Sequence, residues 1–142
     1  MSGLQDIGVR VEEGAGDEPT AQVLAIASEI EQHLKAFLKD GQSASIDLRS
    51  LPLAPGDYQA LKALLGEGEV SARLDALGPS TIYETAIPGV WWLVHRNASD
   101  ELMADLIEIT DCPDILKTQI EDLRDGPERL HARIEQQAAI TQ

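Results

Sequence analysis

The stretch VSARLDALGPSTIYETAIPGVWWLV, residues 70–94, decides the fold. Within residues 70–76, apolar and polar side chains alternate. A period of two is typical of a strand with one buried and one solvated face, as in antiparallel sheets. A Gly-Pro turn follows at residues 78–79, and Pro88 and Gly89 have the residue types of a type II turn. The stretch therefore predicts consecutive strands joined by tight turns.

Three further strands complete the predicted sheet. Residues 81–87 form one of them, and residues 90–94 are apolar on both faces, which predicts a central strand. Residues 101–110 fit a helix or a strand. We favour a strand from about residue 104, because it would pair back on the tryptophan-containing strand as a hairpin.

Two helices and a short strand precede this sheet. Residues 20–39 repeat apolar side chains every three or four positions, with Thr20 suited to the start and Gly41 to the end. Residues 45–49 alternate and predict a short strand. A second helix runs from Pro55 to Gly66. Its predicted inward stripe is Ala60, Leu61, Leu64 and Leu65.

Pro113 opens a last helical region with an apolar stripe, and the Gly-Pro pair at residues 126–127 divides or kinks it. Residues 1–19 are rich in glycine and acids, which predicts a mobile tail, with an alternative short edge strand around residues 7–11. The predicted fold is α+β: an antiparallel β-meander of four to five strands packed with helices, in the order α-β-α-β-β-β-β-α, as one domain over residues 20–142.

Composition excludes several classes of protein. The 142 residues include 11 Lys and Arg against 25 Asp and Glu, a formal net charge of −14. Nucleic-acid backbones and anionic lipid surfaces would be repelled by such a chain. No apolar run approaches the ~20 residues of a membrane span, and the first residues do not form a secretory signal. We therefore expect a cytoplasmic protein.

Four side chains could supply soft metal ligands: Cys112, His33, His95 and His131. No two of the histidines have an i, i+3 or i, i+4 spacing, and a single cysteine forms neither a disulfide nor a Cys-x-x-Cys motif. Ordinary placement of all four, with no metal and no cofactor, is the favoured interpretation. The alternative is a metal- or iron–sulfur-handling protein that uses Cys112 with histidine and carboxylate ligands.

The segment GEGE, residues 66–69, resembles a phosphate loop only in its glycines. It lacks the Lys and Ser/Thr of a P-loop, and Glu67 and Glu69 would repel phosphate. A helix end and a turn into the next strand explain it structurally, and its two acids form an exposed recognition point. A further alternative is a hydrolytic enzyme with Glu69 and Glu84 as paired carboxylates, although no nucleophile or base motif supports it.

Trp91 and Trp92 are neighbours on one strand and therefore face opposite sides of the sheet. One enters the core, and loops cover the other or leave it exposed to a partner protein. A tryptophan left in water would mark a partner surface.

Residues 64–70 (LLGEGEV) and 82–95 (IYETAIPGVWWLVH) together resemble the HupH/HyaF type of hydrogenase expression/formation protein. The resemblance continues through residues 107–109 and Pro113 to about Arg133. It implies an accessory, chaperone-like protein for uptake [NiFe] hydrogenases, associated with maturation of the small iron–sulfur subunit before export, and no catalytic residues.

Several expectations follow from the resemblance. The partner is the hydrogenase small-subunit precursor, together with other maturation proteins. Family members are about twice as long and carry two related segments, so two copies of this single-segment chain would pair as a homodimer. The expected partner-binding residues are Gly66, Glu67, Gly68, Glu69, Glu84, Thr85, Pro88, Gly89, Trp91 and Trp92, which belong to the shared motif together with Val70 and Val90.

Overall fold

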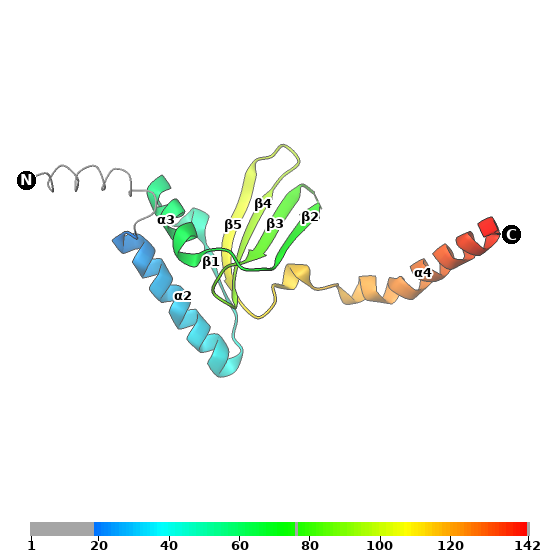
Figure 1. Cartoon of the computed structure of the whole chain (residues 1–142), viewed down its shortest axis with the longest axis horizontal. Coiled ribbons are helices and arrows are strands. Elements are labelled where there is room, and N and C mark those ends of the chain that lie inside the picture. The colour runs from blue at the N-terminus through cyan, green and yellow to red at the C-terminus, as the bar shows by residue number, and fades with distance from the viewer. Residues whose placement is uncertain (1–18, 76, 142) are drawn as a thin grey trace, which may run out of the picture. The chain divides into compact units, whose positions relative to one another are not determined.

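A computed structural model describes residues 19–75 and 77–141 (Figure 1). The chain divides into two compact units, with the boundary between Asp111 and Cys112, and each unit is described by itself. The mobile tail predicted over residues 1–19, with its alternative edge strand, lies outside the described residues except for Pro19. The single domain over residues 20–142 stays a prediction.

The first unit contains a five-stranded antiparallel sheet in the order β1-β5-β4-β3-β2 (Figure 1). The last four strands in the chain form a meander, and the first strand adds to its far side, next to β5. The predicted α+β class, the meander and the central position of the tryptophan-containing strand are confirmed. The strands are β1 (Ala44–Asp47), β2 (Ser71–Asp75), β3 (Pro79–Glu84), β4 (Val90–Arg96) and β5 (Leu102–Ile109).

The helices α2 (Ala21–Asp40) and α3 (Pro55–Leu65) pack on one face of this sheet (Figure 1). The strand register places Trp92 opposite Tyr83 on one side and Ile107 on the other, so these three side chains share that face. The same alternation that predicted the strands thus supplies the core. Its buried members are Val23, Ile26, Ile30, Ile46, Leu48, Ala60, Leu61, Leu65, Val90, Trp92, Ile107 and Ile109.

Both ends of α2 follow the prediction. The Thr20 hydroxyl accepts a hydrogen bond from the Val23 N–H at 3.2 Å, which caps the first turn. Gly41 ends the helix with φ +75°, a left-handed conformation that glycine adopts without penalty. The Thr20 hydroxyl also donates to Asp57 at 2.8 Å, which ties the start of α2 to the start of α3.

Four sequence predictions in this unit need correction. The strand predicted over residues 81–87 is β3 (Pro79–Glu84), because residues 85–89 form the turn to β4, in which the Thr85 hydroxyl accepts from the Ile87 N–H at 3.2 Å. The first strand ends at Asp47 rather than at residue 49, because the Asp47 carboxylate accepts from the Arg49 N–H at 3.0 Å and starts the 3₁₀ turn η1 (Leu48–Ser50). Leu64 is 42% exposed and lies off the inward stripe of α3. Val70 is 46% exposed and precedes β2 rather than opening it.

The second unit contains the 3₁₀ turn η2 (Asp114–Leu116) and the helix α4 (Ile120–Thr141). The helix therefore starts seven residues after Pro113, and a single helix continues through Pro127 where two were one of the predicted alternatives. No side chain of α4 is buried. Among the described residues, we find no helix with the length and apolar character to cross a membrane.

Candidate functional site

The GEGE loop, residues 66–70, is held against the turn of residues 85–89 that joins β3 to β4. Gly66 ends α3, and its N–H donates to the Lys62 carbonyl at 2.9 Å. The Gly68 N–H donates to the Glu84 carbonyl at 2.8 Å, and the Glu84 N–H donates to Val70 at 2.9 Å. These contacts lie in the first unit, and we call the loop together with this turn the motif face.

The backbone of the turn approaches Gly68 so closely that no other residue fits at this position. A Cβ atom added there would lie 2.5 Å from the Thr85 carbonyl oxygen and 3.0 Å from that of Glu84. Real Cβ atoms essentially never come this close, so a side chain would push the loop away from the turn. The loop's second glycine is explained by backbone packing.

Thr85 and Glu84 fix the turn itself. Thr85 is buried, and its hydroxyl donates to the Val90 carbonyl at 2.9 Å and accepts from the Ile87 N–H at 3.2 Å. The Glu84 carboxylate accepts from the Gly89 N–H at 3.1 Å. Gly89 has φ +88°, the left-handed value that a type II turn demands, and Pro88 beside it is exposed.

Glu67 and Glu69 differ from the other motif residues. Both side chains are exposed, and neither makes a hydrogen bond or an ion pair within the described residues. Exposed apolar side chains belong to the same segments, Val70 in the loop and Ile87 in the turn, and the exposed Leu64 lies two residues before the loop. The motif face thus combines uncommitted negative charge with apolar area on a backbone held by hydrogen bonds.

Of the two alternatives for the tryptophans, the structure has the one in which both are covered. Trp91 is 5% exposed, and its indole N–H donates to the Thr110 carbonyl at 3.1 Å. Trp92 is fully buried, and its indole N–H donates to the Asp105 carboxylate at 2.7 Å. Both side chains find hydrogen-bond partners inside the fold, as buried tryptophans usually do.

An aromatic cluster that was not predicted from the sequence surrounds Trp92. The Tyr83 ring stacks on Trp92 with centroids 6.2 Å apart, and the Tyr58 ring meets it edge-on at 5.5 Å. The Lys62 ammonium lies over the Tyr58 and Trp92 rings, 5.2 Å and 5.6 Å from their centroids. The Tyr58 hydroxyl donates to Asp105 at 2.8 Å.

Two pKa shifts follow from this cluster. Burial, and then the hydrogen bond to Asp105 and its negative charge, raise the pKa of Tyr58 far above its ordinary value. Burial, followed by the charges of Glu67 and Asp105, raises the pKa of Tyr83. Both phenols therefore stay protonated at neutral pH. The sequence held an indication of this cluster: Asp105, Ile107 and Ile109 occupy every second position of β5, so the Asp105 side chain faces inward with the two isoleucines.

The alternative functions gain no geometric support. Among the residues that the structure describes, no group of three His, Cys, Asp or Glu side chains could hold a metal ion. His33 lies 3.4 Å from Glu29, His131 lies 3.4 Å from Glu135, and His95 contacts the Ser80 hydroxyl at 2.5 Å. The Glu84 carboxylate, one of the paired acids considered for hydrolysis, is bonded to the Gly89 N–H.

Comparisons with known proteins agree with the motif. Residues 20–137 match the model of the HupH hydrogenase expression protein, C-terminal conserved region. The chain is 33% identical over 125 residues to hydrogenase expression/formation protein HoxQ of Cupriavidus necator, covering 88% of this chain and 42% of that protein. HoxQ of Azotobacter vinelandii is 37% identical over 86 residues, covering 61% and 30%. The chain thus spans less than half the length of these curated relatives.

A solved structure shares the fold. The hydrogenase expression protein HupH from Thiobacillus denitrificans superimposes with a TM-score of 0.78 at 39% identity, over 84% of this chain and 99% of that one. The resemblance that the motif residues indicated is confirmed and extends over both helices that precede the sheet. The chain belongs to the family of the HupH hydrogenase expression protein, through its C-terminal conserved region.

Proposed function

We propose that this chain is an accessory protein in the maturation of an uptake [NiFe] hydrogenase and that it binds the immature small subunit in the cytoplasm. The relatives are named hydrogenase expression/formation proteins, which supports a role in hydrogenase assembly. The proposed role is recognition of another polypeptide, without bond-making chemistry of its own.

One observation carries the proposal: Glu67 and Glu69 are exposed, and make no hydrogen bond or ion pair with any described residue, on a loop whose backbone is held in place. A loop that is already ordered loses little conformational entropy on binding. The two carboxylates favour a basic partner segment, and the exposed Leu64, Val70 and Ile87 supply apolar contact area.

The test is capture of the small-subunit precursor by the full chain. We expect the double variant Glu67→Gln and Glu69→Gln to capture at least tenfold less precursor at low salt, and wild-type capture to weaken as salt screens the charges over ~8 Å. The matched control is Glu29→Gln with Glu31→Gln on α2, which removes the same charge from exposed positions elsewhere. Undiminished capture by the loop variant removes the motif face from the proposal.

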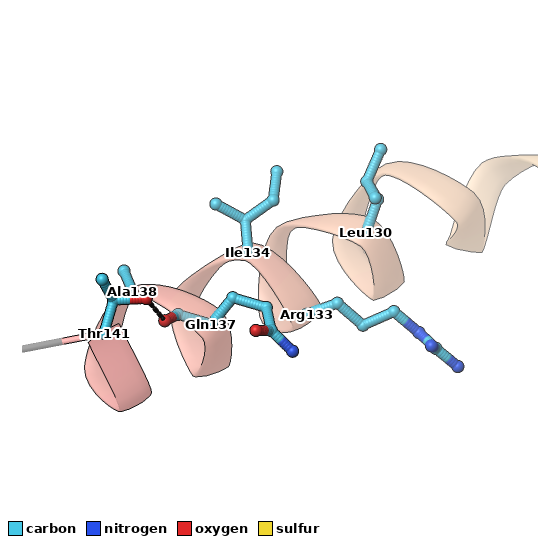
Figure 2. Close-up of a pocket in the computed structure, with 6 residues that line it drawn as sticks. All are labelled: Leu130, Arg133, Ile134, Gln137, Ala138 and Thr141. Carbon is cyan, nitrogen blue, oxygen red and sulfur yellow. Dashed lines mark hydrogen bonds between the residues drawn. The ribbon is translucent and has the colours of Figure 1, made fainter.

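We further propose that two copies pair. The supporting observation is the apolar stripe of α4, in which Leu123, Leu130 and Ile134 are each more than half exposed. Figure 2 shows the C-terminal part of this stripe, where Leu130 and Ile134 project from the same side of the helix. A helix with such a stripe is stable in water mainly when the stripe is covered.

A further inference from the structure

A groove of about 380 Å³ lies in the first unit, at the end of α3 away from the motif face. The segment that joins β1 to α3 forms one side, and the start of β5 forms the other. The apolar walls include Leu51, Leu53 and Leu102, and the polar groups that line it are Arg49, Tyr58 and Asp105. Its volume lies at the lower end of the range of known ligand pockets.

A buried carboxylate reaches this groove. Asp105 is only 4% exposed, and its two oxygens accept one hydrogen bond each, from the Tyr58 hydroxyl and the Trp92 indole N–H. A carboxylate offers about four acceptor positions, so Asp105 can accept further hydrogen bonds from a bound group. No Lys, Arg or His among the described residues lies within 4.0 Å of it.

We propose that this groove binds an arginine or lysine side chain of a partner polypeptide, flanked by apolar residues. The inference rests on the proposed function and adds the chemistry of the segment that is recognised. The methylene stem of a long basic side chain suits walls of Leu51, Leu53 and Leu102, and its charged end suits Asp105. Because Asp105 is buried, its attraction for a cation is screened less than that of a surface acid.

Arg49 at the rim is the competing feature. Its guanidinium donates to the Met103 carbonyl at 2.5 Å, and its side chain is exposed. An acidic partner residue would meet this cation, but in water and at the edge of the groove, where ion pairs contribute little. The buried charge therefore favours a basic occupant, and an acidic peptide serves as the counter-test.

The experiment follows the indole N–H signals by NMR on the full chain, which has two tryptophans. The Trp92 signal reports on the groove, because that N–H is bonded to Asp105. The probes are acetyl-Leu-Arg-Leu-amide, the uncharged isostere with citrulline in place of arginine, and the peptide with glutamate. We expect a saturable shift of the Trp92 signal with the arginine peptide and at least tenfold weaker binding of the other two.

Two variants locate the binding. Asp105→Asn keeps the side-chain size, removes the charge and should weaken the arginine peptide at least tenfold. Leu102→Lys places a cation on a wall residue that is 36% exposed, so it tests the groove even if the first variant does not fold. The control is Leu38→Lys at an 85% exposed position. Leu38 does not belong to the residues that line the groove, and this variant should leave binding unchanged.

The groove and the proposed function can fail separately. Absence of a saturable shift, equal shifts with citrulline, or tighter binding of the glutamate peptide overturns the groove, even when the precursor is captured. A precursor that is never captured overturns the proposed function, even when the arginine peptide binds. Capture that persists in the loop variant and falls in Asp105→Asn assigns recognition to the groove alone.

Discussion

Gly68 sets the position of the GEGE loop through the absence of a side chain. We expect Gly68→Ala to lower the free energy of unfolding of the first unit by about 1–3 kcal/mol, because its Cβ would lie 2.5 Å from the Thr85 carbonyl oxygen. Urea denaturation followed by tryptophan fluorescence measures this, since both tryptophans lie in β4. Gly126→Ala, with no atom within 4 Å, is the control and should leave that transition unchanged. Equal midpoints for both variants would contradict the packing argument.

The raised pKa of Tyr58 makes the free energy of unfolding decrease at alkaline pH. Its pKa is raised in the folded chain above the ordinary value of 10.0, so folding favours the protonated phenol. This stabilisation is complete below about pH 10 and is lost as the pH rises above it. We expect Tyr58→Phe to cost about 1–2 kcal/mol at pH 7, because Asp105 loses a donor, and to show a smaller loss of stability between pH 9 and pH 11 than wild type. Parallel alkaline profiles would contradict the assignment.

The elements differ in what stabilises them. β4 is paired on both sides and contributes two buried tryptophans, whereas α4 has no buried side chain and contains Pro127, which lacks the N–H that a helix interior uses. We expect backbone amides of α4 to exchange with deuterium orders of magnitude faster than those of β4 in the absence of a partner. Protection of α4 equal to that of β4 in a monomer would contradict this.

A substitution within α4 tests the effect of Pro127 on the stability of that helix. Pro127→Ala restores one N–H within α4 and removes a residue that costs about 3 kcal/mol in a helix interior. We expect a larger helical circular-dichroism signal at 222 nm and slower exchange in residues 128–141. The urea midpoint of the first unit, followed by tryptophan fluorescence, should stay unchanged, because α4 belongs to the second unit. A shift of that transition would show energetic coupling that the two-unit division does not predict.

At the scale of the whole molecule, pairing of two copies is the testable property. Light scattering after size exclusion at micromolar concentration should give twice the chain mass of 15.4 kDa. Leu130→Glu with Ile134→Glu places charge on the exposed stripe of α4 and should return the mass to that of one chain. Leu77→Glu, at a 92% exposed position outside α4, is the control. A single-chain mass for the wild type would end the dimer proposal.

Local sequence patterns predicted most elements because their causes are local. The alternation before Gly78, the turn at Pro88 and Gly89, and the caps Thr20 and Gly41 each depend on residues a few positions apart. The errors have longer-range causes. Leu64 fits the helical stripe by spacing, yet no part of the core reaches it, and it is 42% exposed.

The candidate site divides in the same way. The sequence identified the motif residues as a set, but it did not show which of them are exposed. Thr85, Trp91 and Trp92 are hydrogen-bonded inside the fold, whereas Glu67 and Glu69 make no hydrogen bond or ion pair within the part of the chain that the structure describes. Exposure depends on what packs nearby, and that is a property of the assembled sheet and helices.

The sequence by itself determined the α+β class, the meander, the acidic character and the family, because periodicity, turn residues, charge and a motif in two nearby segments can all be read along the chain. Only the tertiary structure decided that Tyr58, Trp92 and Asp105 meet, through hydrogen bonds of 2.8 Å and 2.7 Å between residues 47 and 13 positions apart. No local pattern encodes such a distance, because the packing of α3 against the strand register brings those side chains together.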